Sequence, residues 1–239
     1  NYKLFFFFFI KTLCLHNDGG SKLIISLSAN KDNIKSLHQV IYSILDQNVS
    51  QEFYEILIIL EVEIDELIYM SKELLFLFNE KKIKIITTKK LNLQTRLIFA
   101  IKEYPMNPIL IIDSNLLFPE GWLEMLINDH KLHPDEIISS SIQYYFGKNA
   151  IINEFSEGYK GYLFGTFNHI SNMIFNFAII NTELGGTLYP PGIFKNKYFF
   201  DEKLFSQISN ESDEFWQSCF IIIENKILRQ SSKIYDYTK

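Results

Sequence analysis

The residues best suited to chemistry lie at the end of an apolar run, ILIID, where Asp113 is followed by Ser114 and Asn115. A carboxylate that ends a buried strand of an α/β protein faces the crevice in which such proteins bind ligands. Asp, Ser and Asn also favour ordinary turns, because their side chains bond to the nearby backbone. Two interpretations of Asp113 therefore stay open: a ligand-binding or metal-binding carboxylate, and the end of a strand.

A second acidic group lies in ESDEFW, where Asp213 and Glu214 fall in the first turn of an expected apolar helix. Either carboxylate could act there as a general base presented from a rigid helix start. The positive end of the helix dipole also favours acidic residues at this position. A third segment, LGGTLYPPG (Leu184–Gly192), could bring its backbone close to a ligand or form a structural loop.

Other catalytic patterns are weak or absent in the sequence. His130 and His133 are three residues apart, but no third metal ligand is near them, which favours a solvated helix end. Cys14 and Cys219 show no zinc or disulfide spacing. The sequence contains no GxxxxGK[ST], GxGxxG, HExxH or GxSxG pattern. The sequence therefore lacks the motifs that usually indicate a kinase, a dehydrogenase, a zinc protease or an α/β-hydrolase.

Strands and helices alternate regularly in the first half of the chain, and the end of the fourth strand positions Asp113. Apolar runs of strand length occur at Lys22–Ala29, Tyr54–Leu60, Lys82–Thr88 and Pro108–Asp113. Helical spacing follows each of them: at residues 32–48 behind Asn30 or Asp32 as N-cap, through Leu67 to Phe78, at 93–104, and from Pro119 to about His133. This pattern predicts an α/β fold with a mostly parallel central sheet and helices on both faces.

The carboxyl ends of these strands carry polar residues. Asn30, Glu61, Thr88 and Asp113 each end or follow a predicted strand, so we expect them to face one crevice. A strand is expected at Ile137–Ile142. Residues 143–190 then show neither the spacing of apolar residues typical of a helix nor the runs typical of strands. Order returns with a helix over residues 208–225 and a short strand in KILRQ.

Composition narrows the class of partner. The 239 residues carry a net charge of −5 and no basic face, which argues against a nucleic-acid-binding protein. We interpret residues 1–239 as one domain. The apolar block Leu4–Ile10 is too short to span a bilayer. It is either a terminal strand or tail packed on the body, or a remnant signal or peripheral membrane anchor.

Taken in order, five segments resemble the GT-A-fold glycosyltransferases, and in particular the family-2-like enzymes of bacterial surface polysaccharide assembly. The resemblance covers about residues 23–229. It rests on SLSANKDNIKSLHQVIYSILDQ, RLIFAIKEYP, IIDSNLLFPEGWLEML, GGTLYPPGIF and ESDEFW. It implies a nucleotide-diphospho-sugar transferase fold, with a nucleotide-sugar-binding half at residues 22–142 and an acceptor-side half at 143–239.

The resemblance also implies a reaction and a set of site residues. A sugar would pass from a nucleotide-sugar donor to a glycan or glycolipid acceptor, with inversion, in the cytoplasm or at the inner face of the membrane. Asp113 and Asn115 would bind Mn²⁺ or Mg²⁺ against the donor diphosphate. Asp213 or Glu214 would be the base. Cofactor-site contacts would come from Asn30, Glu61, Asp113 and Ser114.

This sequence departs from the family pattern at the acidic motif. DSN stands where members commonly show DxD, so an amide replaces one metal-facing carboxylate. Gln94 or Thr95 stands where a lysine is expected, and Arg96 is the nearest cation. A degenerate GT-A domain that binds nucleotide-sugar or glycan without turnover is therefore the main alternative. An unrelated α/β binding module is the other.

Overall fold

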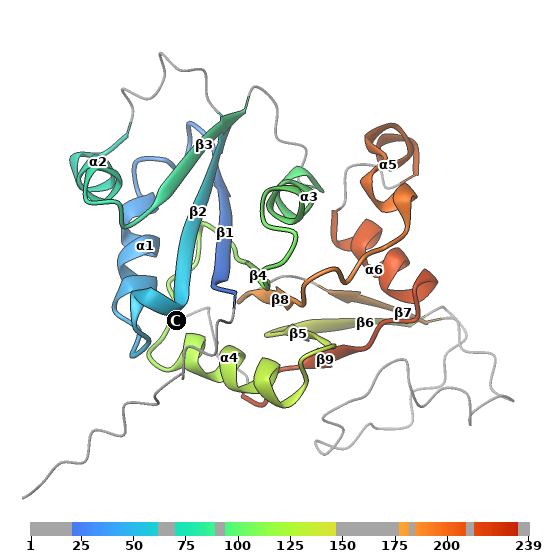
Figure 1. The fold of residues 1–239 in the computed structure, drawn as a ribbon. Helices are drawn as coiled ribbons and strands as arrows, with labels where there is room; N and C mark the ends of the chain where they lie inside the picture. The colour runs from blue at the N-terminus through green and yellow to red at the C-terminus, as the bar shows by residue number, and fades with distance from the viewer. Residues whose placement is uncertain are drawn as a thin grey trace, which may run out of the picture.

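The structure, a computed structural model, describes residues 21–61, 70–88, 94–146, 177–181, 185–208 and 213–233. Its centre is a seven-stranded sheet with the order β3-β2-β1-β4-β8-β5-β9 (Figure 1). The strands are β1 (Leu23–Ala29), β2 (Tyr54–Glu61), β3 (Lys84–Thr88), β4 (Ile109–Ile111), β5 (Ile137–Ser139), β8 (Thr187–Tyr189) and β9 (Leu228–Gln230). Only β8 runs antiparallel to its neighbours in this sheet. The predicted mostly parallel sheet is confirmed.

One face of the sheet is covered by α1 (Leu37–Leu45), α2 (Lys72–Asn79) and α4 (Trp122–Leu132). Buried side chains recur along α1 at the spacing of one helical stripe, at Leu37, Val40, Ile41 and Ile44. They pack with alternate residues of β1 and β2 in the first hydrophobic cluster.

The opposite face is covered by α3 (Gln94–Glu103), α5 (Glu202–Ile208) and α6 (Asp213–Ile223). Their apolar side chains form the second cluster with the remaining residues of the strands. Within it, Trp216 of α6 packs against Phe205 and Phe220. Helices therefore lie on both faces of the sheet, as predicted.

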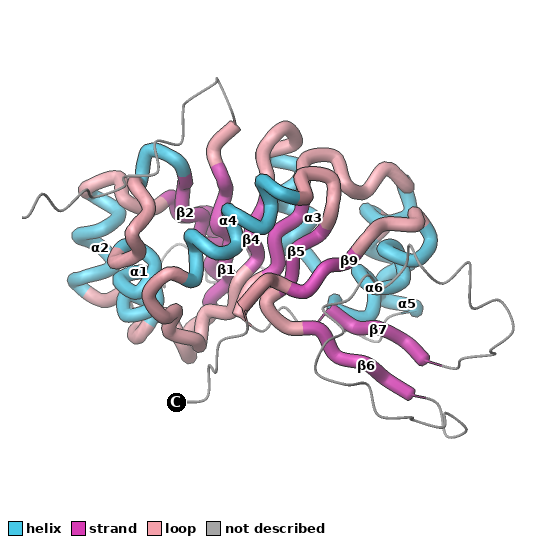
Figure 2. The backbone as a smooth tube through the Cα atoms, turned by 90° about the horizontal axis from the view of Figure 1, so that it is seen from below, coloured by secondary structure: helices cyan, strands magenta, loops and turns pink. Residues whose placement is uncertain are grey.

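A second, two-stranded antiparallel sheet is formed by β6 (Ile142–Phe146) and β7 (Phe177–Asn181). Figure 2 shows it extending beyond the seven-stranded sheet on the side of α5 and α6. In the part of the chain that the structure describes, no helix has the length and apolar character needed to cross a bilayer.

Two predicted helix starts are wrong. The first helix begins at Leu37 with Ser36 as N-cap, because Asn30 and Asn33 bond to the backbone of the loop before it. The helix expected near Pro119 begins at Trp122, since the Pro119 carbonyl closes a turn by accepting the Trp122 N–H at 3.2 Å.

Two predictions for the second half are also corrected. The strand expected over Ile137–Ile142 breaks after Ser139, whose hydroxyl bonds to the backbone of Ser141. The helix expected over residues 208–225 is shorter and occupies Asp213–Ile223. Before it lies α5, which was not predicted. Asp201 caps α5 by accepting the N–H groups of Lys203 and Leu204, each at 3.0 Å.

Candidate functional site

Four parallel strands end at one edge of the sheet, and the predicted site residues follow them there. Asn30 follows β1, and Glu61 and Thr88 are paired at the ends of β2 and β3. Asp113 lies two residues beyond β4, which pairs with β1. The backbone thus brings these residues to the edge predicted for them. The side chain of Glu61 lies outside the described part of the structure.

The triplet Asp113–Ser114–Asn115 forms a tight hydrogen-bonded turn. Asp113 Oδ1 accepts the backbone N–H of Asn115 at 2.8 Å and the side-chain Nδ2 of Asn115 at 3.1 Å. Its second oxygen, Oδ2, has no hydrogen-bond partner among the described residues. The strand-end interpretation of Asp113 is therefore correct for one carboxylate oxygen, and the other remains available to a ligand.

A residue that the sequence analysis did not single out, Asn33, joins this triplet to the loop after β1. Asn33 Nδ2 donates to Ser114 Oγ at 2.9 Å and to Asn115 Oδ1 at 3.4 Å. Asn33 Oδ1 accepts the backbone N–H of Asn30 at 2.9 Å. The two loops are therefore connected through side-chain amides, although about eighty residues separate them in the sequence.

Positive charge reaches the site from α3. Arg96 is buried in the first turn of this helix, and its guanidinium donates to the carbonyl oxygen of Ile112 at 3.5 Å. This carbonyl immediately precedes Asp113. Arg96, which the sequence identified as the nearest cation, thus lies beside the triplet on the α3 face.

Helix α1 and the turn that follows it hold the chain that leaves the triplet. The Gln47 side chain is buried; its Nε2 donates to the Pro119 carbonyl at 3.0 Å and its Oε1 accepts the Leu123 N–H at 3.2 Å. Ser43 Oγ accepts the Phe118 N–H at 3.1 Å. Sequence alone offers only a weak signal for Gln47, a polar residue that extends the apolar stripe of α1. These bonds fix the segment after Asn115 against a packed helix.

The glycine pair of LGGTLYPPG has a structural role. Trp122 Nε1 donates to the Gly185 carbonyl at 2.6 Å. Gly186 has φ +101°, and a Cβ there would lie 3.1 Å from the Trp122 ring and 3.2 Å from Ile112 and Leu110. The close backbone approach is therefore to the core of the protein, at the start of β8.

The predicted base residues open α6. This helix begins at Asp213, so Asp213 and Glu214 occupy its first turn, as expected. Their side chains lie outside the described part of the structure.

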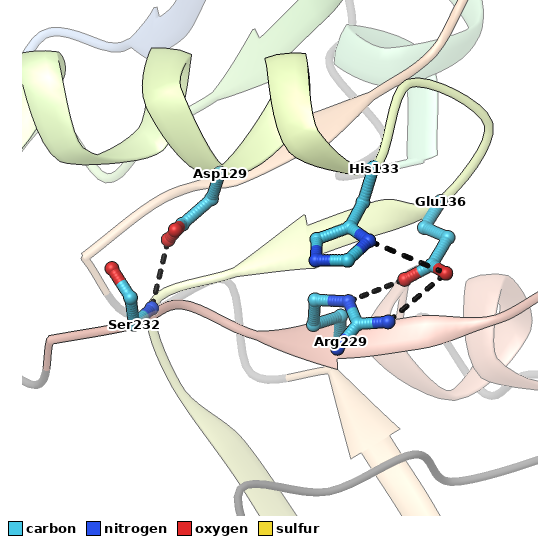
Figure 3. A network of polar contacts seen from close by, with 5 residues as sticks. All are labelled: Asp129, His133, Glu136, Arg229 and Ser232. Atoms are coloured by element: carbon cyan, nitrogen blue, oxygen red, sulfur yellow. Dashed lines mark hydrogen bonds and ion pairs between the residues drawn. The ribbon is translucent and has the colours of Figure 1, made fainter.

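The two histidines lie in the last turn and at the C-cap of α4, and both are half-buried beside exposed residues. Burial lowers the pKa of His130 below the ordinary value. His133 Nδ1 lies 3.8 Å from Glu136, which also pairs with Arg229 of β9 (Figure 3). Nearby, Asp129 accepts the backbone N–H of Ser232 at 2.8 Å. This network joins α4 to the edge strand.

The triplet can supply two oxygens to a divalent cation. Mg²⁺ and Mn²⁺ prefer oxygen ligands, and Mg²⁺ is commonly bound through one or two carboxylates together with substrate phosphates. Asp113 Oδ2 and Asn115 Oδ1 fit such shared binding. Within the described residues, no group of three or more His, Cys, Asp or Glu side chains could hold a metal ion. The donor set therefore fits a cation held jointly with a diphosphate.

The mostly parallel sheet, the helices on both faces and the acidic turn after the fourth strand match the GT-A class of fold. Comparison of the sequence with known families gives the more specific result. Residues 24–195, well over half of the chain, match "Glycosyl transferase family 2". The chain belongs to this family. A comparison with curated protein sequences found no match.

Solved structures agree with the fold. The structure of S. aureus TarS aligns with a TM-score of 0.56 at 15% identity, covering 90% of this chain and 36% of that one. S. aureus TarS 1-349 in complex with UDP gives a TM-score of 0.56 at 14% identity, covering 90% and 59%. The corresponding complex with UDP-GlcNAc gives 0.51 at 11% identity, covering 90% and 57%. The chain thus spans about a third to three fifths of the lengths of these proteins.

Proposed function

We propose that this chain transfers a sugar from a nucleotide-sugar donor to a glycan or glycolipid acceptor, with inversion at the anomeric carbon. One observation carries the proposal: Asp113 follows the fourth strand of a family 2 domain and keeps one carboxylate oxygen available at the shared strand edge. UDP and UDP-GlcNAc complexes of TarS, which has the same fold, support this class of donor.

The donor side of the site is assigned to the strand ends. Asp113 and Asn115 would hold Mn²⁺ or Mg²⁺, which neutralises charge on the leaving nucleoside diphosphate. Ser114 and Asn30 would contact the nucleotide-sugar, and Glu61 the nucleoside. The buried Arg96 adds positive charge beside the diphosphate.

The acceptor side is assigned to α6. The bond between the anomeric carbon and the diphosphate breaks, and its electron pair leaves with the nucleoside diphosphate. A bond forms from the acceptor hydroxyl oxygen on the opposite face of the sugar, and the hydroxyl proton passes to Asp213 or Glu214. A base is required because a sugar hydroxyl is a poor nucleophile at neutral pH.

Release of nucleoside diphosphate from a panel of UDP- and GDP-sugars tests the proposal. The wild-type protein should release it in the presence of a glycan or glycolipid acceptor, and Asp113→Ala should not. Asp213→Asn or Glu214→Gln should abolish transfer and leave UDP affinity unchanged. If neither substitution slows transfer, the assignment of the base is wrong.

A second function is favoured by the internal bonding of the triplet. Because Asp113 Oδ1 is already satisfied by Asn115, the site could bind nucleotide-sugar or glycan without turnover, as a degenerate domain. Nucleotide binding that ignores both Mn²⁺ and Asp113→Ala, with no release of nucleoside diphosphate, would favour this function.

The resemblance to enzymes of bacterial surface polysaccharide assembly supports a place in the cytoplasm, at the inner face of the membrane. The described surface includes three exposed apolar side chains on α2, at Leu75, Phe76 and Phe78, which suit peripheral contact with a membrane. Sedimentation with anionic lipid vesicles tests this placement. Protein that stays entirely in the supernatant would contradict it.

A further inference from the structure

We propose that Asn33 is a positioning residue, which orients Ser114 so that its hydroxyl donates a hydrogen bond directly to the donor diphosphate, beside the Asn115 amide that Asp113 holds. The inference rests on the proposed function for the identity of the ligand. Neutral hydrogen-bond donors would then bind the diphosphate where family members commonly use a second carboxylate and a metal ion.

The orientation of the two amides between the loops is fixed at both ends. At one end, the Asn30 N–H can only donate, so the Asn33 atom that faces it must be Oδ1. At the other end, the ionised Asp113 can only accept, so the Asn115 atom that faces it must be Nδ2. Asn33 Nδ2 then faces Asn115 Oδ1, donor to acceptor, at 3.4 Å. The chain of bonds is consistent in one direction only.

The donor-to-acceptor direction of these hydrogen bonds determines which donors and acceptors of the triplet are left for a ligand. Ser114 Oγ accepts from Asn33, so its own O–H proton is left to donate, and no acceptor for it occurs among the described residues. Asn115 Nδ2 gives one proton to Asp113 Oδ1 and keeps the other. The buried Ser114 hydroxyl and the exposed Asn115 amide thereby keep one proton each, at the same turn as the two oxygens assigned to the cation, Asp113 Oδ2 and Asn115 Oδ1. Phosphate oxygens accept hydrogen bonds, and a cation takes the carboxylate oxygen.

Without Asn33 the Ser114 hydroxyl loses the donor that fixes its orientation, so it could turn and donate to other acceptors. Asp113 would still hold the Asn115 amide in place. Hydrogen bonds to a charged group are stronger than neutral ones, so their loss should weaken diphosphate binding by about tenfold.

UDP affinity measured by calorimetry in EDTA, and again with Mn²⁺, tests the inference. We expect Asn33→Ala to raise the Kd for UDP in EDTA by about tenfold, with a smaller effect when Mn²⁺ is present. Ser114→Ala should weaken binding similarly. The double variant should be little worse than either single one, because the two residues act through one network.

Asn48→Ala is the matched control. Asn48 Nδ2 donates to Glu120 Oε1 at 3.1 Å, so this bond also joins the region of α1 to the segment after β4, but away from the triplet. Asn48→Ala should leave UDP affinity unchanged, and urea unfolding should show similar stability for both alanine variants. A merely structural role for Asn33 would change the unfolding midpoint and leave the Kd of the folded protein as it was.

The outcomes separate this inference from the proposed function. If Asn33→Ala binds UDP in EDTA like the wild type, or if its effect adds fully to that of Ser114→Ala, the inference is overturned while transfer can stand. If the expected Kd pattern appears and no nucleotide-sugar is turned over, the positioning role holds and the proposed transfer fails. A wild-type protein that binds no UDP or GDP refutes both.

Discussion

Restoring the second carboxylate, by Asn115→Asp, should make nucleotide binding strongly dependent on a divalent metal. In the wild type, Asn115 Nδ2 lies 3.1 Å from Asp113 Oδ1 and donates to it. The substitution replaces this donor with an anionic oxygen at nearly the same place. A favourable contact becomes a repulsive one, and the turn loses a donor that would face the diphosphate.

The size of the effect follows from this geometry. In EDTA the new carboxylate would repel the bound diphosphate, and two unit charges about 4 Å apart repel by about 1 kcal/mol in water and about 4 kcal/mol near a protein surface. Because Asn115 is exposed, we take a value near the lower end. The lost hydrogen bond adds about 1 kcal/mol. The total of about 2–3 kcal/mol corresponds to a roughly 30- to 150-fold weaker affinity for UDP in EDTA.

Calorimetric titration of UDP with and without Mn²⁺ measures this effect. In EDTA, Asn115→Asp should bind UDP much more weakly than the wild type, and saturating Mn²⁺ should restore the affinity or exceed it. Asn48→Asp, which makes the same charge change next to Glu120, is the control and should show neither effect. The reasoning is refuted if Asn115→Asp binds UDP in EDTA as the wild type does, or if Mn²⁺ does not improve its binding.

Three further predictions concern the framework around the site. Gln47→Ala should lower the free energy of unfolding by about 2–3 kcal/mol in urea, because buried partners such as the Leu123 N–H lose their bonds; a loss below 0.5 kcal/mol would contradict this role. Gly186→Ala should cost about 1–3 kcal/mol, since its Cβ would crowd Trp122 at a positive φ, and an unchanged thermal midpoint would count against that packing. Burial lowers the pKa of His130 below 6.5, so the unfolded chain binds the proton more readily and stability should fall as pH drops below 6.5. His130→Gln should lose less stability than the wild type between pH 7.5 and 5.5, and equal losses would refute this origin.

The strand ends of the site were predictable from sequence because their signal is local. A run of apolar residues that stops at Asp113 indicates both the buried strand and the polar group that follows it. The same holds for Asn30 after β1. Parallel order then places both residues at one edge, and the pairing of β1 with β4 confirms this part of the prediction.

The contacts that shape the site were not predictable, because they join segments far apart in sequence. From sequence alone Asn33 is a polar residue inside a predicted helix, and its partners in the triplet lie about eighty residues away. Asn33 instead bonds to the loop backbone, which delays the helix to Leu37. For the glycine pair the sequence left two interpretations open, and the close approach of Gly186 to Trp122 favours the structural one. Neither the role of Asn33 nor that of Gly186 can be predicted from local sequence, because each depends on residues that only the folded chain places beside it.

The most direct test of the central claim is the Mn²⁺ dependence of UDP and GDP binding by the wild type and by Asp113→Ala. We expect Mn²⁺ to lower the Kd of the wild type for one of these nucleotides. Asp113→Ala should remove that gain and keep the weaker, metal-independent binding. Nucleotide affinity that responds neither to Mn²⁺ nor to the loss of Asp113 would contradict the assignment of this turn as the diphosphate site.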